Sequence, residues 1–224
     1  PEALRNRDSE YPYRWDSYFY YLSGFPEPQA AQVMKVDGDR TETLLFCREK
    51  NPEREVWDGF RYGPDAAREI FGFDEAHPIS ALPEKLPEFA SDRPALFTPL
   101  GQFDPWDRQV TQLLNEVRSR ARTGVAAPDD VVDVRGALDR MRLSKDEHEV
   151  ALMRRAGAVS SGAHRRAMAA TRPGWFEYQV EAELLHEFLR HGALAVAYPS
   201  IVASGPNACV LHYRDNNREM AAGE

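Results

Sequence analysis

The chain has 224 residues, of which 42% are hydrophobic, and a formal net charge of −8 at pH 7. This length allows one large or two modest domains with a real core. The negative charge argues against nucleic acid or an anionic membrane as the main partner, and no apolar run approaches the roughly 20 residues that span a bilayer.

Strands and helices are predicted to alternate in the first half of the chain. Residues 18–25 are largely aromatic and end near a glycine, which favours a strand. Residues 31–36 and 43–46 are predicted strands around the turn Asp37-Gly38-Asp39, a hairpin pattern. Further along we predict a short helix or loop at 52–60, helices at 63–71 and 79–89, a strand at 95–98 and a long amphipathic helix at 104–121. This alternation indicates an α/β domain.

A change in composition suggests where a second domain begins. Residues 123–130 are small, polar and proline-containing, so we interpret them as a linker and predict domains at 1–124 and 125–224. Ser144 with Glu147 three residues later is a capping box, which predicts a helix start. Small apolar residues then share one face until Pro173-Gly174, and a second helix is predicted to end near Gly192.

The stretch from Tyr198 to Tyr213 is predicted as a strand, a turn and a second strand. Residues 200–203 are mostly apolar, and Gly205-Pro206-Asn207 has strong turn chemistry. His212 would stand at the end of the second strand, where a neutral imidazole can donate, accept or bind a transition-state oxyanion. Taken alone, a single strand histidine is more often a half-buried structural residue.

Other candidate motifs in the sequence do not form a metal site. His186 and His191 are five positions apart, whereas zinc ligands of a helical motif are four apart and share one face. Acidic pairs in turns are interpreted as solvated loop charges. The two cysteines, Cys47 and Cys209, indicate neither a disulfide framework nor a metal cluster, and they favour a reducing, cytoplasmic location.

Longer motifs carry a resemblance to a known family. They are residues 8–14, 16–28, 141–145, 152–157, 172–178 and 185–193 and the closing pair His212-Tyr213. With these motifs in this order, the chain resembles the aminopeptidase P (Xaa-Pro aminopeptidase) family of pita-bread metallopeptidases. The resemblance implies an α/β N-terminal domain followed by the start of an α+β pita-bread domain, incomplete at its C-terminal end.

The resemblance also implies an activity. Members of the family remove the N-terminal residue from peptides with proline in second position, using a hydroxide held by two Mn²⁺ ions in each active site. Their five metal ligands lie downstream of these residues, so this chain alone is expected to hold no metal and to be inactive. The implied partners are proline-containing peptides and further copies of the chain, without nucleic acid or membrane.

Five residues correspond to functional positions of the family. His212 matches the histidine that binds substrate or the tetrahedral intermediate, and Tyr198 matches a tyrosine that lines the pocket. Asp8, Trp57 and Arg122 match residues of the N-terminal domain that approach the active site, some across a subunit boundary of a dimer or tetramer.

Two alternatives stay open. Residues 194–197 depart from the polar, aromatic family pattern before Tyr198, which leaves room for a prolidase or creatinase relative. The other alternative is a non-catalytic binding or assembly module on the same fold.

Overall fold

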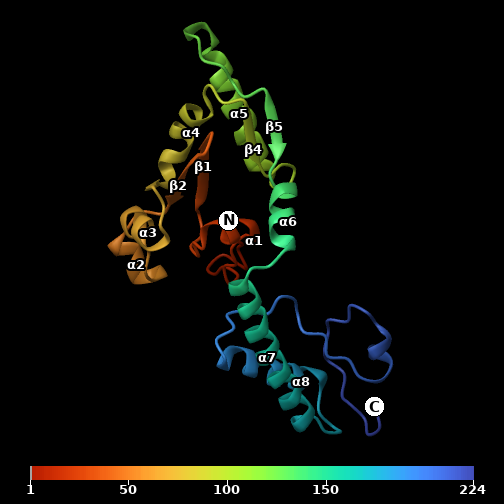
Figure 1. Ribbon diagram of the computed structural model, residues 1–224. Coiled ribbons are helices and arrows are strands. Elements are labelled where there is room, and N and C mark those ends of the chain that lie inside the picture. Colours follow the sequence, from red (N-terminus) through yellow and green to blue (C-terminus); the bar gives the residue numbers. More distant parts are fainter. Residues whose placement is uncertain (1) are drawn as a thin grey trace. The chain divides into compact units, whose positions relative to one another are not determined.

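The computed structural model describes residues 2–224, and the chain divides into two compact units, Pro1–Arg142 (unit 1) and Leu143–Glu224 (unit 2) (Figure 1). This division lies later than the 124/125 boundary expected from the sequence, because β5 (Asp130–Asp133) pairs in parallel with β4 (Ala95–Thr98). The segment interpreted as a linker therefore leads into another strand of unit 1.

Unit 1 is built on a three-stranded sheet in the order β1-β2-β3. β1 (Ala31–Asp37) and β2 (Arg40–Cys47) form the predicted antiparallel hairpin, turning at Gly38 with a φ of 59°. β3 (Glu75–Pro78) joins β2 in parallel. It was not predicted, because its four residues include no Val, Ile, Thr, Phe, Tyr or Trp, the residues that favour strands.

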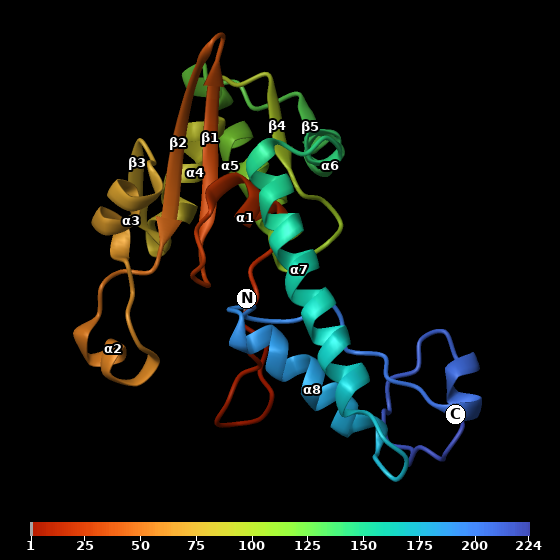
Figure 2. The same ribbon diagram turned by 60° about the horizontal axis from the view of Figure 1, so that its bottom comes forward.

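Helices cover both faces of this sheet (Figure 2). The helices of unit 1 are α1 (Ser17–Ser23), α2 (Pro52–Asp58), α3 (Gly63–Phe71), α4 (Leu82–Ala90), α5 (Asp104–Ser119) and α6 (Arg135–Leu143), with short 3-10 turns η1 (Ile79–Ala81) and η2 (Ala121–Thr123). Leu45 of β2 packs with Ala67 of α3. Its neighbour Leu44 packs with Leu82 of α4 on the opposite face, because side chains alternate along a strand.

The aromatic segment predicted as a strand is a helix, α1. Asp16 caps its start by accepting hydrogen bonds from the amides of Tyr18 and Phe19 at 3.0 and 2.9 Å. Gly24 ends it in the left-handed conformation, with a φ of 62°. The two caps outweigh the strand preference of the aromatic residues, so the prediction of a strand here was wrong.

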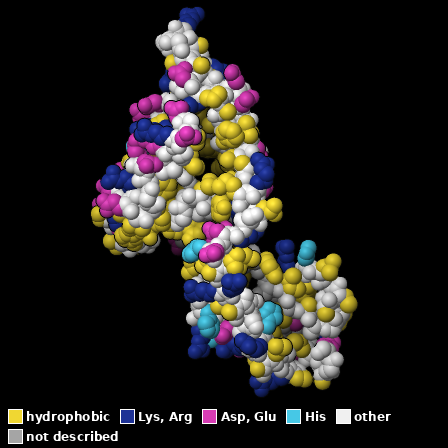
Figure 3. Space-filling view, in the orientation of Figure 1, with side chains coloured by type: hydrophobic (Ala, Val, Ile, Leu, Met, Phe, Trp, Pro, Cys, Tyr) yellow, Lys and Arg dark blue, Asp and Glu magenta, His cyan; other side chains and the backbone are white. Residues whose placement is uncertain are grey.

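Apolar side chains are exposed on the two-stranded sheet of unit 1 (Figure 3). Phe97 of β4 is 60% exposed, and Val131 and Val132 of β5 are also exposed. This pair of strands therefore presents an apolar surface to solvent.

Unit 2 begins with two helices that pack together, α7 (Glu147–Ala170) and α8 (Glu177–Arg190). A capping box starts α7, but Asp146 and Glu149 form it, two residues later than predicted. Ala163 and Ala167 are buried, and Arg166 on the same helix pairs with Glu183 of α8 at 2.5 Å.

The predicted strands around His212 are absent from the described residues of unit 2. Residues 198–204 are irregular, η3 (Gly205–Cys209) is a 3-10 helix, and residues 211–212 form a turn. A strand needs a partner along its edge, whereas the polar groups of this segment bind side chains of α8 instead. The strand–turn–strand prediction was therefore wrong.

Candidate functional site

A buried carboxylate organises the irregular segment that follows α8. Glu177, the first residue of that helix, is 0% exposed. Its Oε1 accepts hydrogen bonds from the amide and hydroxyl of Ser204, at 2.7 and 2.8 Å, and from Nδ2 of Asn207 at 3.4 Å. Its Oε2 accepts from the hydroxyl of Tyr213 at 2.7 Å and from the amide of Arg218 at 3.0 Å. One side chain thus holds four positions of this segment.

The same contacts keep the Glu177 carboxyl ionised. Burial by itself raises the pKa of Glu177, but hydrogen bonds from Arg218, Tyr213 and Ser204 outweigh it and lower the pKa to about 2. Burial and the hydrogen bond to Glu177 raise the pKa of Tyr213. Both shifts favour a protonated tyrosine that donates to a charged carboxylate.

Asn216 makes a second connection between the segment and α8. It is 3% exposed and adopts a φ of 45°. Its Oδ1 accepts from the amide of Val202 at 3.0 Å, and its Nδ2 donates to Oε2 of Glu181 and to the carbonyl of Ser200, both at 2.9 Å. Glu181 stands one helical turn after Glu177, so one face of α8 holds both connections.

Backbone hydrogen bonds close the base of the segment. The amide of Glu177 donates to the carbonyl of Arg218 at 3.0 Å, and the amide of Met220 donates to the carbonyl of Trp175 at 2.8 Å. The chain after Arg218 therefore returns alongside the residues that precede α8.

His212 lies on this anchored segment with its side chain exposed. The next residue, Tyr213, is buried and held by Glu177. An accessible imidazole on a fixed backbone can donate a hydrogen bond to a ligand or accept one from it. The backbone of His212 is thus anchored by side-chain hydrogen bonds to Glu177, in place of the strand pairing expected from the sequence.

The other predicted residues are all exposed. Tyr198 of unit 2 is irregular in conformation, and no hydrogen bond joins it to His212 within residues 2–224. In unit 1, Trp57 lies on α2 with 84% of its surface exposed, Arg122 lies in η2, and Asp8 lies in a bend. Figure 1 shows α2 and the C-terminal end of α5, next to η2, at opposite ends of unit 1. Unit 1 therefore does not bring Trp57 and Arg122 together.

Sequence reasoning missed Glu177 and Asn216. Glu177 follows the turn at Pro173-Gly174 and two aromatic residues, a position where an acidic residue is expected merely to favour the helix N-terminus. Its hydrogen-bond donors lie 27 to 41 positions away. The role of Glu177 in anchoring the segment follows only from the burial and hydrogen bonds of its carboxylate. The spacing of nearby residues in the sequence does not predict these contacts.

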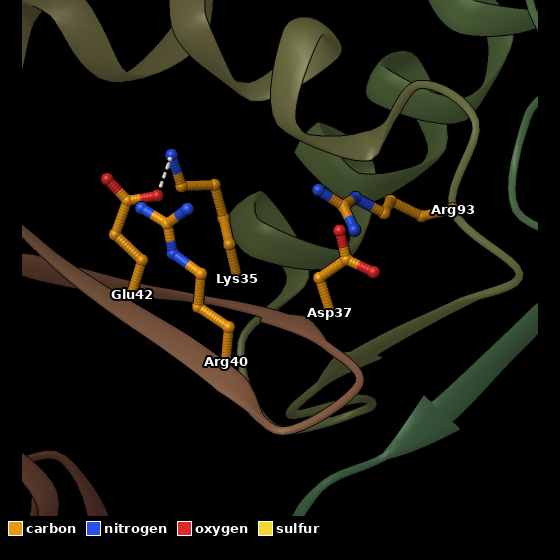
Figure 4. A pocket seen from close by; sticks show the side chains of 5 residues that line it. All are labelled: Lys35, Asp37, Arg40, Glu42 and Arg93. Atoms are coloured by element: carbon orange, nitrogen blue, oxygen red, sulfur yellow. Dashed lines mark ion pairs between the residues drawn. The ribbon is translucent and has the colours of Figure 1, made fainter.

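A charged hollow lies on the β1–β2 hairpin of unit 1 (Figure 4). The residues that line it are Lys35, Asp37, Arg40, Glu42 and Arg93. Lys35 and Glu42 already form an ion pair at 2.7 Å. None of the predicted site residues lines this hollow.

Metal-ligating side chains do not converge in the part of the chain that the structure describes. Within residues 2–224, no three His, Cys, Asp or Glu side chains are grouped so as to hold a metal ion. Across the same residues, no helix combines the length and apolar character that a membrane crossing requires.

Two family descriptions match the sequence. "Aminopeptidase P, N-terminal domain" matches residues 1–97, and "Metallopeptidase family M24" matches residues 151–224. Residues between these ranges belong to neither match, so the domain boundary at 124/125 stays a prediction.

Curated relatives and solved structures agree with these matches. The Xaa-Pro aminopeptidase of Escherichia coli (strain K12) is 41% identical over the whole chain, which covers 51% of that relative. The Xaa-Pro aminopeptidase of Haemophilus influenzae is 37% identical, with 49% of it covered. The structure of zinc-substituted E. coli aminopeptidase P in complex with product superposes with a TM-score of 0.96 at 41% identity, over all of this chain and 51% of that one. The chain thus spans about half the length of the proteins that it matches.

Proposed function

The chain belongs to the aminopeptidase P family, with its N-terminal domain and the first part of its metallopeptidase domain, and on this premise we propose that the complete enzyme removes the N-terminal residue from peptides with proline in second position. The observation that carries the proposal is likeness to Xaa-Pro aminopeptidases along all 224 residues, in sequence and in fold.

We assign His212 a role in binding the reacting group. As the peptide bond before proline is attacked, its imidazole donates a hydrogen bond to the oxygen that gains negative charge, or orients the proline residue. The exposed side chain and the anchored neighbour Tyr213 support this assignment. Tyr198, exposed in the same unit, lines the substrate pocket in this proposal.

The metal ions of the family do not fit the residues described. Within residues 2–224 no ligand set gathers, so we propose that two Mn²⁺ ions in each active site are held by residues outside this part. The residues present bind and orient substrate. By themselves, the 224 residues cleave no peptide.

Unit 1 contributes to the site through assembly. We propose a homo-oligomer, a dimer or tetramer formed through the N-terminal domain, in which Trp57, Arg122 and Asp8 approach the active site, some of them across a subunit boundary. The exposure of Trp57 and of Val56 beside it on α2 supports this, since neither side chain is covered within unit 1. The two free cysteines support a cytoplasmic location.

The test is substrate selection by the full-length protein with Mn²⁺. We expect cleavage of a Xaa-Pro-Xaa tripeptide and little cleavage of the matched Xaa-Ala-Xaa tripeptide. Equal rates on both peptides contradict the proposal. Cleavage of a Xaa-Pro dipeptide alone would support the prolidase-like alternative. Binding of the tripeptide without cleavage would support the non-catalytic module.

A further inference from the structure

The segment that carries His212 is closed at both ends by one carboxylate. Glu177 binds the amides of Ser204 and Arg218, which lie fourteen positions apart. Both amides belong to irregular backbone, so no strand or helix ladder satisfies them in place of Glu177. The ends of the segment are therefore fixed relative to α8.

A further contact lies inside the segment, directly beside the histidine. The hydroxyl of Tyr213 donates to Glu177 and accepts from Nδ2 of Asn207 at 3.0 Å. Because the Tyr213 ring is buried and its hydroxyl is paired, the backbone at Tyr213 is fixed, and so is the adjoining backbone of His212. The imidazole itself is exposed and takes its position from that backbone.

We infer that Glu177 is a positioning residue for His212, acting through Tyr213 and through the closure of residues 204–218. This inference rests on the proposed function of His212. A positioning role of this kind is sensitive to small shifts, because misplacing a reacting group by about 1 Å can lower turnover roughly 10²-fold.

Two substitutions distinguish the contacts of the Glu177 carboxylate from those of the Tyr213 hydroxyl. Glu177→Gln keeps the shape of the side chain, but its amide group points a donor at groups that are themselves donors. Tyr213→Phe keeps the buried ring and removes only the hydroxyl. Glu183→Gln is the matched control, because Glu183 lies on the same helix and pairs with Arg166 rather than with the segment.

The test is a double-mutant cycle with His212→Ala in the full-length protein, loaded with Mn²⁺. We expect Glu177→Gln to lower kcat by about tenfold to 10²-fold while KM changes less than about threefold, and Glu183→Gln to leave both near wild type. In the His212→Ala background, Glu177→Gln should have no further effect on kcat. Multiplied effects of the two substitutions would overturn the inference, since they would indicate a general structural role.

Two further experiments cover the cases in which a variant does not fold or the wild-type protein is inactive. If Glu177→Gln does not fold, the same cycle with Tyr213→Phe applies, with the same expected and contrary results. If the wild-type protein cleaves no Xaa-Pro peptide, the proposed function fails, and spectra of isotope-labelled histidine decide the inference. A His212 ring signal that broadens or shifts in Tyr213→Phe supports positioning, and an unchanged signal overturns it.

Discussion

The hydroxyl of Tyr213 donates a 2.7 Å hydrogen bond to the buried carboxylate of Glu177, which lies 36 positions earlier in the chain. His212 directly precedes this tyrosine and is exposed. The pair therefore links the first turn of α8 to the histidine that we propose binds the reacting group. A helix end, rather than a sheet, fixes the backbone of His212 within unit 2.

Acid should weaken this link in a defined pH window. The pKa of Glu177 is about 2 in the folded protein, below its ordinary value of 4.5. A lowered folded pKa means that the contribution to stability is complete above about pH 4.5 and is lost as the pH falls towards 2. We expect the Tm of the wild-type protein to fall more steeply in this window than that of Glu177→Gln, measured by calorimetry. Parallel pH profiles for the two proteins would contradict this account.

Asn216 should be hard to replace. Asn216→Ala removes three hydrogen bonds and puts alanine, which tolerates the left-handed conformation less well than asparagine, at a φ of 45°. The expected loss is about 1–3 kcal/mol in the free energy of unfolding. Asn216→Gly loses the same hydrogen bonds but adopts this φ freely, so it should lose less despite its greater chain entropy. Denaturant titration of both variants checks the order, and an Asn216→Ala variant as stable as wild type would refute it.

The cap of α1 should be measurable as well. Asp16→Ala removes the acceptor for the amides of Tyr18 and Phe19 and should cost about 0.5–2 kcal/mol in unfolding free energy. Asp16→Asn is the control, because asparagine caps helices nearly as well and should cost much less. Equal losses for both substitutions would mean that charge, and not capping, explains the role of Asp16.

Trp57→Ala should affect function without affecting folding. The side chain is 84% exposed on α2, so the free energy of unfolding should change by less than about 0.5 kcal/mol. In the full-length protein we expect a higher KM for Xaa-Pro peptides, because the proposed role of Trp57 is to contact substrate. An unchanged KM would remove Trp57 from the site.

Much of unit 1 was predictable from local patterns. The hairpin of β1 and β2 follows from alternating side chains and the turn at Asp37-Gly38, and α3 and α5 follow from their proline starts and apolar spacing. α1 was not predictable from its aromatic composition, which favours a strand. A cap at Asp16 and a left-handed glycine decided that segment instead.

The site was predictable only in part, for a physical reason. His212 was proposed as a site residue from a family motif, and that proposal stays a prediction, whereas the strand conformation expected around it was wrong. A strand was expected from residues that are apolar or β-branched, whereas Glu177 and Asn216 hold that stretch in irregular form through contacts with α8. Such contacts join residues 14 to 41 positions apart, beyond the reach of any local spacing rule.

The most direct test of the account is turnover of a Xaa-Pro-Xaa peptide by full-length His212→Ala protein compared with wild type at equal bound Mn²⁺. The account predicts a kcat lower by roughly 10² or more, with metal content unchanged, because the role proposed for the imidazole is to stabilise the reacting oxygen and not to bind metal. A variant with wild-type turnover, or one that has lost its metal, would contradict the role assigned to His212.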